Sequence, residues 1–193
     1  MTEEQDQRIF FALWPDLATR DALVRVQERW LRLGRLAATS PRGPRVMRAD
    51  SFHLTLAFVG SANPVHVQHC ADLLNRLVRE ASIHDEQGLD CVLERPVNFG
   101  NAATLAASDT PPALLHLREF LSSNLQSHSI EFDSKHFHPH VTLVRNARRP
   151  AHPVRNQASD DKVLFKSRAI GLYTAAGEGG VRRYEAIVEF PLS

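Results

Sequence analysis

The sequence has few of the features that mark specialised classes of protein. Its 193 residues include two cysteines, Cys70 and Cys91, and neither belongs to a Cys-x-x-Cys pair, so a disulfide framework is excluded. We expect both to be reduced thiols in a cytoplasmic protein. No apolar run approaches the ~20 residues of a membrane-spanning helix, and the acidic start MTEEQDQRIFFALWP does not fit a signal peptide.

A strong charge of one sign is also missing. The formal net charge is +1 at pH 7, so the chain lacks the extended basic face of a duplex-binding protein. We therefore expect any contact with nucleic acid to be local and short. With 43% hydrophobic and 23% charged residues, the composition is that of a globular protein with a substantial core.

Hydrophobic periodicity predicts a mixture of strands and helices. Helical spacing indicates helices at 16–36, 63–81 and 111–128. Short apolar runs indicate strands at 8–14, 52–60, 138–145, 165–174 and 182–190, and a strand pair around a Gly-Asn turn within 91–109. Polar loops are expected at 38–51 and 146–162, and a glycine-rich turn at 175–180. Because no linker or low-complexity segment separates two folding units, we predict a single α+β domain over 1–193, built of two similar lobes.

One four-residue pattern occurs twice. The first copy, at 53–56, is His-Leu-Thr-Leu, and the second, at 140–143, is His-Val-Thr-Leu. Alternate residues of a strand face the same side, so the histidine and threonine of each copy are expected to share a face. A single copy would be weak evidence for a functional site, because a histidine on a strand is most often structural. Two copies, in separate halves of the chain, predict that each lobe supplies half of one site.

These side chains suit phosphodiester chemistry without a metal. A neutral imidazole accepts a proton and its protonated form donates one, so His53 and His140 form a candidate acid–base pair. The hydroxyls of Thr55 and Thr142 are donors for phosphoryl oxygens, where charge builds in the transition state. We expect no cofactor.

The motifs resemble those of the two-histidine (2H) phosphoesterase superfamily, and within it the bacterial and archaeal RNA 2′,3′-cyclic phosphodiesterases, also called 2′-5′ RNA ligases. The likeness extends to RIFFALWP (8–15), FHLTLAFVG (52–60), FHPHVTLVRNA (137–147) and LYTAAGEGGVRRYEAI (172–187). It implies a bilobal α+β fold, with two antiparallel sheets facing each other across a central cleft and helices packed outside. It also implies opening of a 2′,3′-cyclic phosphate at an RNA 3′ end to a 2′-phosphomonoester, with 2′-5′ ligation as a side activity.

The same resemblance implies that Arg145, five residues after the second histidine, binds phosphate. A 2′-phosphate product requires the acid beside O3′, and we assign His53 as acid and His140 as base. Tyr184 and Phe52 are candidates for stacking on a base, although Phe52 equally fits a place in the core.

Other interpretations stay open. His136, His138 and His140 alternate in KHFHPH and suggest a metal site, but no cysteine or carboxylate cluster stands at ligand spacing, so we expect no metal. The substrate is alternatively a 2′-5′ oligonucleotide or a cyclic nucleotide derivative, or the chain is an inactive RNA-binding module. We expect the partners to be RNA 3′ ends or nucleotides with a 2′,3′-cyclic phosphate. No membrane and no obligate protein partner are expected, and a monomer is the default.

Overall fold

The chain folds into strands and helices in nearly the predicted order. The computed structural model describes residues 7–80, 88–149, 161–176 and 183–192. The helices are α1 (Leu17–Arg32), α2 (Pro64–Glu80) and α3 (Pro112–Ser127), with a short 3-10 turn η1 (Ala49–Ser51). The strands are β1 (Gln7–Pro15), β2 (Ala37–Ala38), β3 (Arg45–Val46), β4 (Leu54–Ala62), β5 (Cys91–Phe99), β6 (Ala102–Ala107), β7 (His140–Arg145), β8 (Ala147–Arg148), β9 (Val163–Phe165), β10 (Ser167–Ala176) and β11 (Arg183–Pro191).

Nine of the described strands form one curved antiparallel sheet that has two halves, and β2 pairs with β8 in a separate two-stranded sheet. The strand order is β11-β10-β1-β4 in the first half and β7-β6-β5-β9 in the second, and β3 pairs with β7. Where the halves meet, β4 and β7 share one registered residue pair, Leu54 with Val141. The α+β class is as predicted, but the two predicted sheets are joined at this narrow contact rather than separate.

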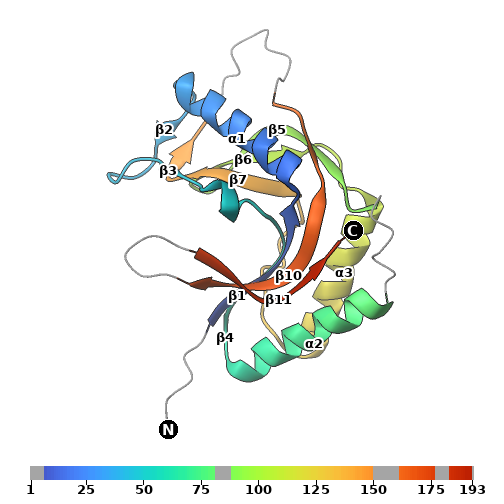
Figure 1. Cartoon of the computed structure of the whole chain (residues 1–193). Helices are drawn as coiled ribbons and strands as arrows, with labels where there is room; N and C mark the ends of the chain where they lie inside the picture. The colour runs from blue at the N-terminus through green and yellow to red at the C-terminus, as the bar shows by residue number, and fades with distance from the viewer. Residues whose placement is uncertain (1–6, 81–87, 150–160, 177–182, 193) are drawn as a thin grey trace.

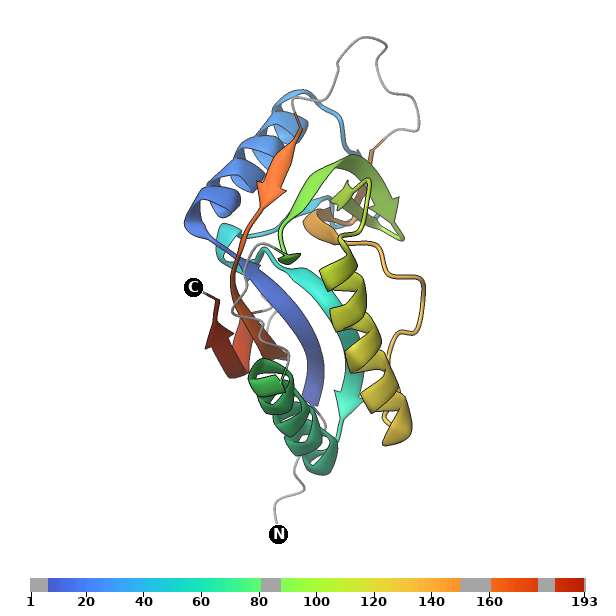
Figure 2. The ribbon, with the colours of Figure 1, turned by 90° about the vertical axis from the view of Figure 1, so that its right-hand side faces the viewer.

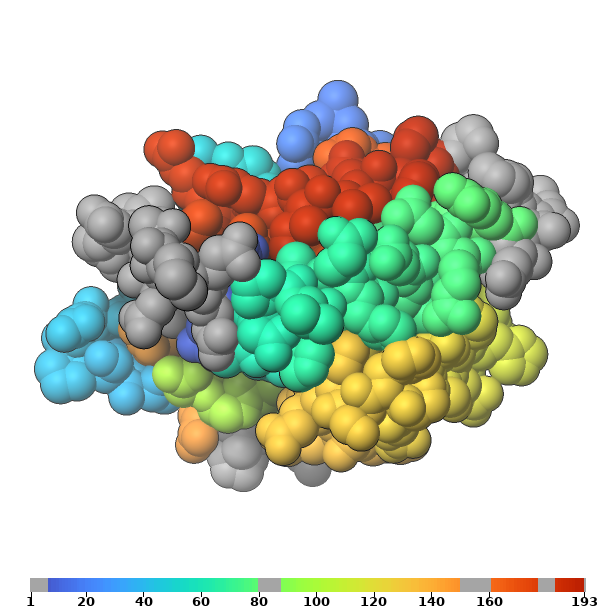
Figure 3. Space-filling view, turned by 90° about the horizontal axis from the view of Figure 1, so that it is seen from below, coloured from blue at the N-terminus to red at the C-terminus, as the bar shows by residue number. Residues whose placement is uncertain are grey.

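The helices cover the outer side of the curved sheet. Helix α1 packs on β7 and β9 of the second half, while α2 packs on β1, β4, β10 and β11 of the first (Figures 1 and 2). Helix α3 contacts β4 and lies beside α2, and the two helices run next to each other across the face seen in Figure 3. No helix in the described residues is long and apolar enough to cross a membrane.

Strand β1 is apolar on both faces, and this explains why it carries no alternating polar pattern. Ile9, Phe11 and Leu13 belong to the main core between sheet and helices. On the other face Phe10 and Ala12 form a second cluster with Tyr173, against which Trp14 and Tyr184 pack. We call this second group the aromatic cluster.

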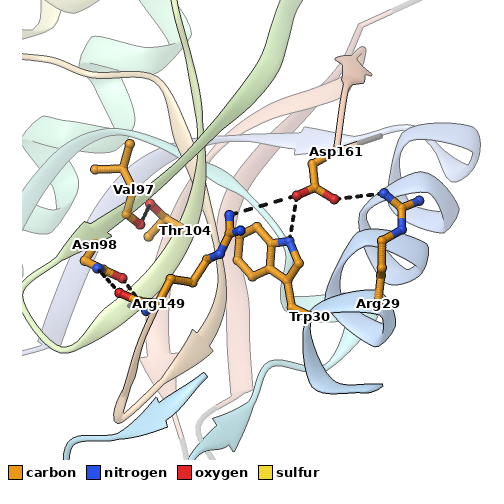
Figure 4. Close-up of polar contacts among 7 residues, drawn as sticks. All are labelled: Arg29, Trp30, Val97, Asn98, Thr104, Arg149 and Asp161. Atoms are coloured by element: carbon orange, nitrogen blue, oxygen red, sulfur yellow. Dashed lines mark hydrogen bonds and ion pairs between the residues drawn. The ribbon is translucent and has the colours of Figure 1, made fainter. Parts of the chain in front are cut away.

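A buried carboxylate ties α1 to the second half of the sheet. Asp161 accepts hydrogen bonds from Arg29 (2.8 Å) and from the indole of Trp30 (3.0 Å), and forms an ion pair with Arg149 at 3.9 Å (Figure 4). The Arg149 guanidinium lies 4.7 Å from the centre of the Trp30 ring. The backbone N–H of Arg149 donates a hydrogen bond to the side-chain oxygen of Asn98, and the Arg149 carbonyl accepts one from the side-chain nitrogen. Each bond is 2.9 Å long (Figure 4).

Several predicted details can be compared with the structure. The Gly-Asn turn joins β5 to β6, and Gly100 has a φ of +58°, a conformation that favours glycine. Loop 38–51 contains β3 and η1, and loop 146–162 contains β8. Of the glycine-rich turn, residues 177–180 lie outside the described residues. Cys70 and Cys91 are free and buried, and burial raises the pKa of each thiol to about 12.

Candidate active site

The register between β4 and β7 brings the two His-x-Thr motifs together. Leu54 pairs with Val141, and both side chains point into the main core. Their neighbours therefore point to the opposite face, where the antiparallel register places His53 near Thr142 and His140 near Thr55. We call this side of the sheet the site face.

Both histidines are held in the same way by the backbone. Nδ1 of His53 donates a hydrogen bond to the carbonyl of Ser51, and Nδ1 of His140 donates to the carbonyl of His138, each at 2.7 Å. A carbonyl only accepts, so the proton of each neutral ring lies on Nδ1. Nε2 of each ring is then the unprotonated nitrogen, free to take a proton.

The surroundings of the two rings differ. His53 is stacked on Trp14, with ring centroids 5.0 Å apart and an interplanar angle of 11°. Phe10 lies 5.0 Å away, and the edge-on ring of Tyr184 lies 4.9 Å away. The His140 ring has Phe99 at 4.5 Å as its aromatic neighbour among the described residues.

These surroundings lower the pKa of both histidines. Burial is the main cause of lowering the pKa of His53 to about 4, and the charges of Arg145 and His140 lower it further, against the Ser51 carbonyl. Burial also lowers the pKa of His140. Arg145 acts on both rings, so its charge lies close to both.

Arg145 occupies a position suited to an anion. Across the β3–β7 pair its partner is Arg45, so two guanidinium-bearing residues lie opposite each other beside the site. Among the described residues, none accepts a hydrogen bond from the buried Nε of Arg145. A phosphate group supplies the negative charge and the acceptors that this position favours.

The described residues offer no evident metal centre. Nowhere among them do three or more histidine, cysteine, aspartate or glutamate side chains gather in a way that would hold a metal ion. The exposed rings of His136 and His138 contact each other, with centroids 4.6 Å apart. His138 contributes its carbonyl to the positioning of His140.

The structure contradicts one of the roles predicted for side chains. Phe52 is 1% exposed in the main core, so it has no free ring face for a base, and its alternative place in the core is correct. Tyr184 lies beside His53, and Thr55 and Thr142 are half-buried on the site face.

Sequence reasoning also missed residues that line the site. Trp14 and Phe10 were assigned only to a buried strand, and Tyr173 and Phe99 received no role. The available signal was the alternation in RIFFALW, which puts Phe10, Ala12 and Trp14 on one face and Ile9, Phe11 and Leu13 on the other.

Comparisons with known proteins bear on this arrangement. No family model matches the chain. The RNA 2′,3′-cyclic phosphodiesterase of Escherichia coli (strain K12) is 26% identical over 145 residues, which cover 74% of each chain. Escherichia coli LigT in complex with 3′-AMP has a TM-score of 0.70 at 21% identity, and the match covers 98% of this chain and 99% of that one. The chain is thus similar in sequence to this phosphodiesterase and has the fold of LigT.

The resemblance inferred from the motifs and the predicted fold class are thus confirmed. A second similar structure, a Thermus thermophilus protein, has a TM-score of 0.66 at 23% identity, with coverage of 96% of this chain and 97% of that one. More distant is the PDE domain of MHV ns2, with a TM-score of 0.50 at 14% identity, over 84% of this chain and 98% of that one.

Proposed function

We propose that this protein is a metal-independent RNA 2′,3′-cyclic phosphodiesterase, with His53 and His140 as its acid–base pair. The observation that carries the proposal is the Leu54–Val141 pairing, which sets both His-x-Thr motifs on one face of the sheet. The name of the Escherichia coli relative supports the reaction type. Ligation of RNA ends through a 2′-5′ linkage is the corresponding side activity.

The proposed reaction divides between the two imidazoles. One takes a proton from a water molecule as its oxygen attacks phosphorus, and the other protonates O3′ as the P–O3′ bond breaks. The product is a 2′-phosphomonoester. The hydroxyls of Thr55 and Thr142 and the guanidinium of Arg145 stabilise the charge that develops on the phosphoryl oxygens.

We also propose a reversal of the roles assigned from the sequence. Burial lowers the pKa of both rings, and that of His53 to about 4, so His53 is neutral at pH 7 and can accept a proton as the base. His140 then serves as the acid that protonates O3′, and it has to take up its proton before the reaction. A substrate with sulfur in place of O3′ has a leaving group that does not need protonation. We expect this substrate to restore turnover to His140→Ala and not to His53→Ala. If it restores turnover to His53→Ala instead, His53 is the acid, as assigned from the sequence.

The reaction itself is tested on a short RNA ending in a 2′,3′-cyclic phosphate, in the presence of a chelator. We expect a 2′-phosphate product from the wild type and a loss of about 10²-fold or more in kcat for His53→Ala and for His140→Ala. The exposed neighbour His136→Ala is the matched control. No turnover by the wild type would move the assignment to another phosphoester, such as a 2′-5′ oligonucleotide, or to an inactive RNA-binding module.

A further inference from the structure

Helix α1 contains a buried polar residue, Gln27, to which the proposed reaction gives no role. Gln27 is 5% exposed, and its side-chain nitrogen donates two hydrogen bonds. One goes to the Met47 carbonyl at 2.9 Å and the other to the Leu143 carbonyl at 2.7 Å. A side-chain amide has two N–H donors, so both are used. A single side chain therefore joins two segments that are far apart in the sequence.

The two accepting carbonyls belong to the segments that carry the His-x-Thr motifs. Leu143 is the last residue of the second motif and follows His140 by three positions on β7. Met47 precedes the first motif and is connected to His53 through η1. Helix α1 contacts both η1 and β7 (Figure 1). Gln27 thus bridges the two motifs from the side opposite the site face.

The connection from Met47 to His53 is short and is held by backbone bonds. The carbonyl of Arg48, the next residue, accepts a hydrogen bond from the backbone N–H of Ser51 at 3.0 Å. The Ser51 carbonyl in turn accepts the bond from Nδ1 of His53. A displacement of Met47 is therefore transmitted to the imidazole across one tight turn.

The joint between the two halves of the sheet is narrow at this place. Strands β4 and β7 share one registered pair, Leu54 with Val141. Strand β3 adds a second attachment to β7, and the Met47 N–H extends it by a 3.0 Å bond to the Leu143 carbonyl. A strand of two residues is a weak attachment by itself. Gln27 closes the end of this attachment, and its neutral amide does so without burying a charge.

We propose that Gln27 is a positioning residue, which sets the separation of His53 and His140 by bridging the segments that carry them. This inference rests on the proposed function. One imidazole takes a proton while the other gives one, so both must lie within reach of the same phosphodiester at the same time. A change of about 1 Å in their separation is enough to cost on the order of 10²-fold in rate.

The experiment is a double-mutant cycle on the short RNA that ends in a 2′,3′-cyclic phosphate. Gln27→Met keeps the length of the side chain and removes both donors. We expect it to lower kcat about 10-fold or more in the wild-type background, with KM changed less than about 3-fold, because Gln27 does not touch the substrate. In the His140→Ala background it should change kcat less than about 2-fold, since no pair is left to position. Gln27→Asn keeps the donors but is too short to reach both carbonyls, so it should show the same two results.

Asp161→Ala is the matched control. It also loosens α1, through the bonds to Arg29 and Trp30, but it leaves both bonds of Gln27 in place. Urea denaturation of each variant gives its loss of stability. We expect Asp161→Ala to lose as much stability as Gln27→Met and to keep kcat within about 2-fold of the wild type.

Three outcomes would overturn the inference and leave the proposed function standing. An equal loss of kcat in the two backgrounds would mean that Gln27 supports the fold and not the histidine pair. A loss in Asp161→Ala as large as that in Gln27→Met would mean that loosening of α1 is the cause. An unchanged kcat in Gln27→Met would mean that the bridge does not set the separation. Failure of the wild type to turn over the RNA would instead remove the proposed function and this inference with it.

Discussion

At the scale of single residues, the two histidines of the site differ most in what touches them. His53 lies among Trp14, Phe10 and Tyr184, while Phe99 is the aromatic neighbour of His140 in the described part of the chain. Identical motifs have thus acquired unlike environments. Neighbouring strands, rather than the motifs themselves, set the difference in pKa.

Trp14 is the residue whose replacement tests this difference. Trp14→Leu removes the ring stacked on His53, and because burial is the main cause of its low pKa, that pKa should rise from about 4 toward 6.5. With neutral His53 as base, kcat/KM falls as pH falls through this pKa. We therefore expect the acidic limb of the pH profile to move to higher pH, with a loss of about 3- to 5-fold at pH 5 and little change at pH 8.

Trp14→Phe serves as the matched control, because it keeps an aromatic ring over the imidazole. The charges of His140 and Arg145 that also act on His53 are the same in both variants. An acidic limb that stays in place in Trp14→Leu would show that the indole does not set the protonation of His53.

Residue-scale prediction from the sequence succeeded where strict alternation holds and failed where it breaks. The histidines and threonines of both motifs share the site face, as alternation requires. Alternation also puts Phe52, next to His53, on the core side, in agreement with its alternative place in the core. Phe58, which is 36% exposed, was overlooked because the β-bulges after Thr55 and Thr142 have no counterpart in the hydrophobic pattern. Bulges depend on pairing between strands, which a single sequence does not display.

At the scale of elements, the attachment of α1 depends on Asp161. This carboxylate is 5% exposed and binds Arg29, Trp30 and Arg149 (Figure 4). Asp161→Ala removes the acceptor that the two guanidinium groups and the indole share. We expect a loss of about 2–4 kcal/mol in the free energy of unfolding, measured by urea denaturation.

The exposed pair Arg48–Asp50 is the comparison for that measurement. Its bond of 2.7 Å is as short as the buried one, but both side chains face water. Asp50→Ala should leave the unfolding free energy nearly unchanged. A similar loss of unfolding free energy in both variants would mean that the burial of Asp161 adds nothing to stability.

Long elements were predictable and short ones were not. The three helices and the main strands follow apolar periodicity, and helix α1 begins after Asp16, whose side chain accepts a 2.7 Å bond from the Thr19 backbone. Strands β3 and β8 contain two residues each and lie in segments predicted as loops. Two residues carry no periodicity, so only their pairing with β7 and β2 defines them.

At the scale of the whole molecule, the near-neutral charge limits the number of RNA phosphates that the protein is expected to contact. The net charge is +1, and Arg145 is the arginine whose charge lowers the pKa of both histidines. We expect contact with one or two phosphates, so kcat/KM on short RNA should fall only about 3- to 7-fold between 50 and 200 mM salt.

The salt series is best run on two RNAs of different length with the same 3′ end. Equal slopes of log kcat/KM against log salt agree with a local contact at the terminal nucleotide. A much steeper slope for the longer RNA would reveal an extended phosphate track that the net charge does not predict.

The bonds from the two histidines to Ser51 and His138 have a consequence for how this sequence evolves. Each imidazole is oriented by a peptide carbonyl two residues upstream, and every amino acid supplies that carbonyl. The tautomer of each ring therefore places no requirement on the side chains at 51 and 138, although the Ser51 hydroxyl donates a hydrogen bond to the Arg48 carbonyl. The sequence can change at these two positions while both imidazoles keep their orientation.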